Sequence, residues 1–144
     1  MDWKKTLGTQ DLNWWTVISG MGMNLILTVF LLFGIAALSI TETGEILITL
    51  VMSLGGFLIP LFTALICGRI SGEKFLAYAF YPLIGFLIPV VPGIVVGGGM
   101  MAVLMVAFGV LGAFNGATIA ARNVMKRRQR IKHLVQDSIE EKES

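Results

Sequence analysis

The sequence predicts an all-α integral membrane protein with four transmembrane helices and a cytoplasmic, amphipathic helical extension at the C-terminus. The composition predicts this class, since 56% of the 144 residues are apolar and only 14% are charged, whereas soluble domains carry about 25% charged residues. Mean hydropathy is +0.82. The apolar residues also gather into segments close to the ~20 residues that a helix needs to cross the hydrocarbon core of a bilayer.

The apolar segments divide the chain into a four-span membrane domain, 1–121, and a tail, 122–144. The expected spans are about 15–40, 46–67, 75–96 and 100–121. Polar residues separate the first three. The turn between the third and fourth spans stays open within 89–99, because prolines favour an early break and the glycine triplet 97–99 favours two spans of full length.

The basic residues give the orientation. Lys4 and Lys5 precede the first span, Arg69 and Lys74 lie between the second and third spans, and every other basic residue follows the fourth. The positive-inside rule assigns the side that carries lysine and arginine to the cytoplasm. We therefore expect both termini to be cytoplasmic, and we expect the membrane to be a prokaryotic cytoplasmic membrane.

The spans contain no Asp, Glu, Lys, Arg or His in their interior. Proton relays and ion pathways usually depend on such intramembrane ionisable groups, and catalysis needs a nucleophile with a base, or a metal with ligands. The single cysteine, Cys67, and the single histidine, His133, are too few for a metal or haem site. The expected protein is non-catalytic and has no cofactor and no metal site.

Two amides stand out in the apolar spans. Asn24 and Asn115 lie at similar depths from the cytoplasmic ends of the first and fourth spans, with a difference of about 4–5 Å at 1.5 Å per residue. The two side chains are therefore expected to be able to meet as a polar intramembrane pair. Interhelical hydrogen bonding is the favoured interpretation, and a polar ligand site in the inner leaflet is the alternative.

The fourth span has small residues at a spacing of four, which is typical of helices whose backbones approach closely. The predicted helix-packing residues are Gly109, Gly112, Ala113, Gly116, Ala117 and Ala120. Their partner is either a neighbouring span or another subunit. Prolines are expected to kink the second and third spans; they are Pro60, Pro82, Pro89 and Pro92. The pentapeptide GFLIP contains Pro60 and recurs with Pro89, so any cavity is expected beside these two prolines.

The tail is basic near the membrane and acidic at its end. The residues expected to contact anionic lipid headgroups of the inner leaflet are Arg122, Lys126, Arg127, Arg128, Arg130 and Lys132. Ile131, Leu134 and Val135 recur at helical spacing, so the fourth helix is expected to continue as an amphipathic helix. Lipid contact is favoured over protein docking. Nucleic acid is excluded as a partner, because the basic run is short and has no interleaved aromatic residues.

These features favour a small accessory or scaffold subunit, whose expected partners are the lipid bilayer and either another membrane protein or further copies of the chain. One alternative is a small oligomeric transporter or channel for a neutral or lipid-like solute, because prolines can free backbone carbonyls as ligands. A last alternative is a lipid-acting enzyme at the membrane surface that uses Glu73, Lys74 or His133. These three residues form no recognised constellation.

Overall fold

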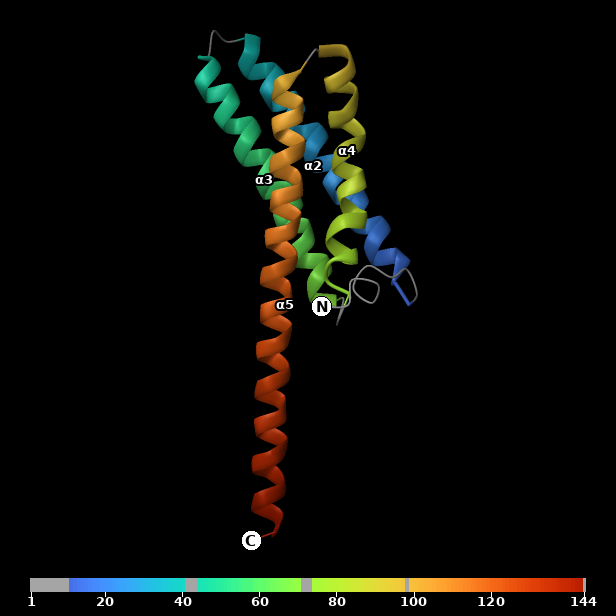
Figure 1. Cartoon of the computed structure of the whole chain (residues 1–144), viewed down its shortest axis with the longest axis vertical. Helices are drawn as coiled ribbons and strands as arrows, with labels where there is room; N and C mark the ends of the chain where they lie inside the picture. Colours follow the sequence, from blue (N-terminus) through green and yellow to red (C-terminus); the bar gives the residue numbers. More distant parts are fainter. Residues whose placement is uncertain (1–10, 41–43, 71–73, 98, 144) are drawn as a thin grey trace.

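A computed structural model describes residues 11–40, 44–70, 74–97 and 99–143, and this part of the chain is helical apart from short connections. Its helices are α2 (Trp14–Ile40), α3 (Glu45–Ile70), α4 (Ala77–Gly97) and α5 (Met100–Glu143). Figure 1 shows them side by side, with successive helices running in opposite directions. Helices α2 and α4 end, and α3 and α5 begin, at one end of the bundle. Helix α3 ends and α4 begins at the other end, where α5 leaves the bundle.

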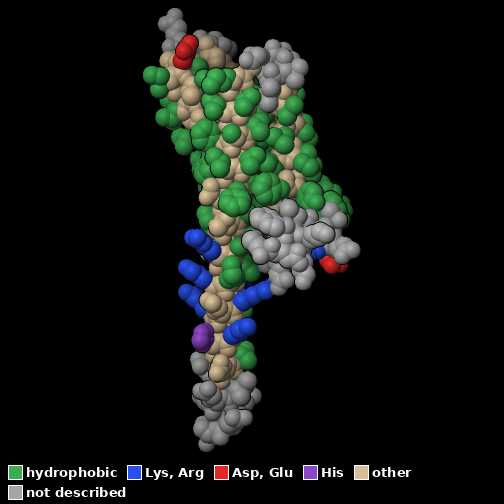
Figure 2. Space-filling model, viewed as in Figure 1, with side chains coloured by type: hydrophobic (Ala, Val, Ile, Leu, Met, Phe, Trp, Pro, Cys, Tyr) green, Lys and Arg blue, Asp and Glu red, His purple; other side chains and the backbone are tan. Residues whose placement is uncertain are grey.

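Three of the described helices are long and apolar enough to cross a membrane. The qualifying segments are Trp14–Ser39, Glu45–Ile70 and Met100–Gln136, whereas the described apolar stretch of α4, Ala77–Pro92, is shorter. The outer surface of the bundle agrees with a lipid environment, since hydrophobic side chains cover the face seen in Figure 2. Phe30 and Phe33 on α2, for example, are each 71% exposed. In water, such a continuous apolar surface would be costly.

The core of the bundle lies where α3, α4 and α5 meet. Phe86 of α4 and Met105 of α5 are almost completely buried there, together with Ala113 and Ala117 of α5. Large side chains thus come from α4 and from the early part of α5, and alanines fill the later part of α5. The alanines allow α5 to approach its neighbours closely along its later part, and the large side chains fill the space between the helices elsewhere in the core.

The turn between the last two helices lies at the glycine triplet. Helix α4 ends at Gly97 and α5 begins at Met100, so Pro89 and Pro92 lie inside α4. Pro60 and Pro82 are likewise inside helices, and both are buried. A proline removes one backbone hydrogen bond, but neighbouring helices make this tolerable in a membrane. Proline favours the end of a helix, but in α4 packing against neighbouring helices outweighs that tendency. The expected kinks remain a prediction.

Helix α5 is the longest element, with 44 residues. Its first half packs in the bundle, and from Arg122 onward it projects away from the other helices as one continuous ribbon (Figure 1). At 1.5 Å per residue, the projecting part, residues 122–143, is about 33 Å long. Because no loop interrupts α5, the projecting half is connected directly to the packed half.

Candidate functional site

The small residues of α5 form the interface with α3 and α4 of the same chain. All six of the predicted helix-packing residues are buried. A Cβ atom added at Gly112 would collide with the carbonyl oxygen of Phe57, and one at Gly116 would lie 2.5 Å from the carbonyl oxygen of Leu61. At Gly109, the added atom would meet the ring of Phe86 of α4, 2.5 Å away. The face is therefore already occupied and is not free for another subunit.

A buried polar network joins α2, α3 and α4. The Asn24 Nδ2 atom donates a hydrogen bond to the carbonyl oxygen of Pro82 at 2.8 Å, and the Thr63 hydroxyl donates to Asn24 Oδ1 at 2.6 Å. The hydroxyl of Thr28 donates to the backbone carbonyl of Asn24 at 2.6 Å. The three polar side chains are at most 1% exposed. The network thus links three helices through a single amide.

The polar groups of this network are satisfied within the protein. Among the described residues, no buried side-chain nitrogen or oxygen lacks a hydrogen-bond partner. Thr63 has two acceptors in reach, Asn24 Oδ1 at 2.6 Å and the carbonyl oxygen of Ile59 at 3.0 Å. Its single proton favours the shorter bond. Because lipid offers no hydrogen bonds, this arrangement stabilises the helix contacts and leaves no polar group for a ligand.

The structure does not bring Asn24 and Asn115 together, so the expected amide pair is wrong. Asn24 is inside the bundle and bonds to α3 and α4. Asn115 is on the exposed surface of α5, and its Nδ2 atom donates to the carbonyl oxygen of Leu111 on the same helix at 2.8 Å. Similar depth in the membrane is not sufficient for contact, because the two side chains point in different directions around their helices.

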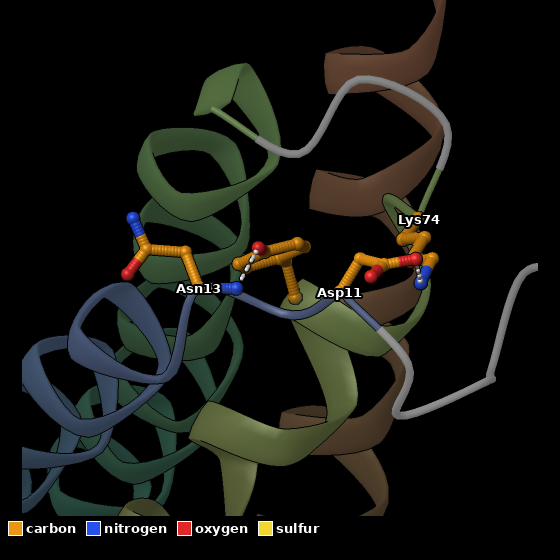
Figure 3. A network of polar contacts seen from close by, with 4 residues as sticks. Asp11, Asn13 and Lys74 are labelled. Atoms are coloured by element: carbon orange, nitrogen blue, oxygen red, sulfur yellow. Dashed lines mark hydrogen bonds and ion pairs between the residues drawn. The ribbon is translucent and has the colours of Figure 1, made fainter.

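The start of α2 is tied to the start of α4. The backbone N–H of Asn13 donates to the Tyr78 hydroxyl at 2.6 Å, and Asn13 Oδ1 accepts a 3.4 Å bond from the N–H of Thr16, as helix N-caps do. Nearby, Lys74 and Asp11 form an ion pair of 4.0 Å (Figure 3). Asp11 is 97% exposed, so the ion pair contributes little to stability. The contacts fix the polar end of the bundle.

Within the described structure, only one of the two prolines expected to lie beside a cavity does so. Pro60 is buried in packed protein, whereas Pro89 borders a cavity of about 260 Å³ between α4, α5, α2 and α3. Its other neighbours include Leu32, Met52 and Met105, and none of the described residues that line it is charged. The cavity offers an apolar environment with no side chain that could coordinate an ion.

A groove of about 350 Å³ follows the outer boundary between α3 and α5. It is lined by Ser53, Leu54, Phe57, Phe108, Leu111 and Asn115. Its walls are apolar except for a serine and the exposed amide of α5. This groove was not predicted from the sequence, because Asn115 was expected to face Asn24 inside the bundle. The helical spacing of Phe108, Leu111 and Asn115, which puts them on one face, is the signal that would have found it.

The basic residues expected to contact lipid headgroups lie on the projecting half of α5, and all six are exposed. In Figure 2, lysine and arginine side chains gather just beyond the hydrophobic part of the bundle. Of the residues considered for lipid chemistry, Glu73 lies outside the described residues. Lys74 faces Asp11, and His133 is on the exposed half of α5. The described structure gives no contact between Lys74 and His133 that would form a reactive pair.

Comparisons with known protein families, with curated proteins and with solved structures find no match to this chain. Three features of the molecule bear on its function: the geometry of the bundle, the exposed face of α5 and the projecting half of α5.

Proposed function

We propose that this protein is a small, non-catalytic membrane scaffold or accessory subunit that packs against other membrane helices. One observation carries the proposal: α5 is built into the bundle through close glycine contacts and continues without interruption about 33 Å beyond it. Because its first half is held in the bundle, the projecting half of α5 has a fixed direction. Its exposed side chains can contact lipid headgroups and other proteins. The bundle supports it with a polar network that has no free group for chemistry.

The proposed topology has four spans with both termini in the cytoplasm. The alternating directions of α2 to α5 support it, as does the 21-residue length of α4. At 1.5 Å per residue, α4 is about 31 Å long, enough to cross the hydrocarbon core. The basic side chains of the projecting half would then face the cytoplasm and the anionic inner leaflet.

The topology can be checked by labelling single cysteines with a membrane-impermeant maleimide in a Cys67→Ala background. We expect Ile46→Cys, at the exposed start of α3, to react in intact cells. Gln129→Cys, on the projecting half of α5, is expected to react only after the membrane is opened. Equal labelling of both positions in intact cells would contradict the proposed topology.

The scaffold function predicts a stable native complex that depends on the projecting half of α5. We expect gentle extraction from native membranes to yield the full chain in a defined assembly larger than one copy. Leu134 is 68% exposed on the projecting half, and Leu134→Asp should weaken any contact with a protein partner there. Gln129→Asp, also on this exposed half, is the matched control for added charge. A lone monomer in every extraction would overturn the proposal.

A second candidate function is a small oligomeric transporter or channel for a neutral or lipid-like solute. The apolar cavity beside Pro89 favours it, since its size and lining suit a small neutral molecule. A flux assay in sealed vesicles separates this candidate from the scaffold, because a scaffold alone gives no uptake of solute.

A further inference from the structure

Asn115 is a polar side chain in an unusual place, the outer surface of a helix that is apolar around it. It lies about 9 Å before Ala121, measured along α5 at 1.5 Å per residue, and the basic residues begin after Ala121. Its Nδ2 atom bonds to the carbonyl oxygen of Leu111. Within the described structure, its Oδ1 atom receives no hydrogen bond. An amide oxygen without a hydrogen bond costs free energy in hydrocarbon. A hydrogen-bond donor from outside the bundle would remove this cost.

The residues around Asn115 form a regular stripe. They alternate at spacings of four and three, as in the seam of a coiled coil, and lie on the side of α5 away from its buried small residues. The stripe consists of Leu104, Phe108, Leu111, Asn115 and Thr118, each exposed or partly exposed. Along the stripe, Leu104 is followed by Phe108, and Leu111 is followed by Asn115. We call this set the α5 outer stripe.

The α5 outer stripe borders the groove between α3 and α5. Phe108, Leu111 and Asn115 form one wall of the groove, and residues of α3, including Phe57, form the other. The volume of about 350 Å³ gives room for side chains of an additional helix beside the stripe. A helix that packs on the stripe would therefore contact two helices of this chain and bury the amide of Asn115.

A second copy of the chain is the occupant that fits these observations. Two copies inserted in one membrane with the same topology have parallel α5 helices related by a two-fold axis along the membrane normal. In such a pair, identical residues face each other at the same depth. An asparagine amide has both a donor and an acceptor, so two Asn115 side chains can bond reciprocally, as buried asparagines do in parallel coiled-coil dimers. A lipid chain offers no such group.

We propose that two copies of this chain pair through the α5 outer stripe, with their Asn115 amides hydrogen-bonded to one another. The inference rests on the proposed function, because it names the membrane partner of the scaffold as the chain itself. Arg122 occupies the next position of the seam after Asn115 and Thr118 and is exposed. Two facing arginines repel each other, so the pairing ends at the membrane surface and the projecting halves stay separate.

The test uses the full chain reconstituted in phospholipid vesicles, with energy transfer between labelled copies measured across protein-to-lipid ratios. We expect a dimer that Asn115→Leu weakens at least about three-fold, the effect of losing a single interhelical hydrogen bond in a membrane. Asn115→Gln retains the amide and should weaken it less. Phe30→Leu, on the exposed surface of α2, is the control and should leave the dimer unchanged.

Cysteine cross-linking gives an independent readout in the Cys67→Ala background. Leu111→Cys lies in the stripe, and Val110→Cys lies beside it on another exposed face of α5. The inference expects severalfold faster disulfide formation between copies at position 111 than at position 110. Equal rates at the two positions, a monomer at every protein-to-lipid ratio, or an Asn115→Leu dimer as tight as the wild type would each overturn it.

The failure of this inference differs from the failure of the scaffold function. If the copies stay monomeric in vesicles while another protein co-purifies from native membranes, the self-pairing is wrong and the scaffold remains. If the copies pair through Asn115 but sealed vesicles that hold the dimer take up a small neutral solute, the self-pairing stands and the scaffold function fails.

Discussion

Gly112→Ala is expected to destabilise the bundle strongly, although it adds a single methyl group. The added Cβ atom would collide with the backbone carbonyl oxygen of Phe57, so no side chain can rotate away to relieve the contact. Helix α5 must move away from α3, and this separation loosens the contacts of the alanines along the same face. We expect a loss of about 1–3 kcal/mol in the free energy of unfolding, the range for overpacked interiors. Unfolding by SDS in mixed micelles, followed by tryptophan fluorescence, measures it.

Gly22→Ala is the matched control for this substitution. Gly22 is also inside a helix, but an added Cβ atom there would meet nothing within 4 Å. Alanine favours helix more than glycine does, by up to about 1 kcal/mol in water. We therefore expect the Gly22→Ala protein to be as stable as the wild type or slightly more stable. If Gly112→Ala and Gly22→Ala behaved alike, the close contact between α3 and α5 would be wrong.

The helices could be predicted from the sequence because their signal is strong and local. Long apolar segments and polar connections determine where a helix begins and ends in a membrane protein, and α2, α3 and the first half of α5 follow them closely. The sequence does not determine the position of the turn after α4, since proline and glycine give conflicting local signals. It is decided by contacts that the sequence does not display, because Phe86 and Val90 of α4 are buried against neighbours.

The direction in which each side chain points was harder to predict. In a soluble helix, polar residues mark the outer face, but lipid and the protein core are both apolar, so the hydrophobic pattern does not distinguish them. Small residues did identify the face of α5 that packs inside the chain, as at Gly112 and Gly116. Nothing comparable indicated the orientation of Asn24 and Asn115. Their depth was readable from the sequence, whereas their rotation about the helix depended on how the helices pack.

Asn24→Leu tests whether the buried network stabilises the bundle. The substitution removes the bonds that the Asn24 side chain makes with Thr63 and Pro82, and it places a branched apolar side chain where a planar amide fits. We expect a loss of about 1–3 kcal/mol in the free energy of unfolding, since each interhelical hydrogen bond contributes about 0.6–1.7 kcal/mol in membranes. The same SDS unfolding experiment measures it.

A double-mutant cycle with Thr63→Val separates the hydrogen bond from changes in packing. The threonine hydroxyl has a second acceptor in the carbonyl oxygen of Ile59, so it stays satisfied when the amide is lost. Thr63→Val alone leaves Asn24 Oδ1 without that donor in the core. The double variant should therefore be more stable than the sum of the single effects predicts, with a coupling of about 0.6–1.7 kcal/mol.

Thr49→Val is the control, because its hydroxyl bonds only within its own helix, and it should change stability by less than about 0.5 kcal/mol. Additive effects of Asn24→Leu and Thr63→Val would mean that the 2.6 Å contact between these two side chains contributes nothing of its own.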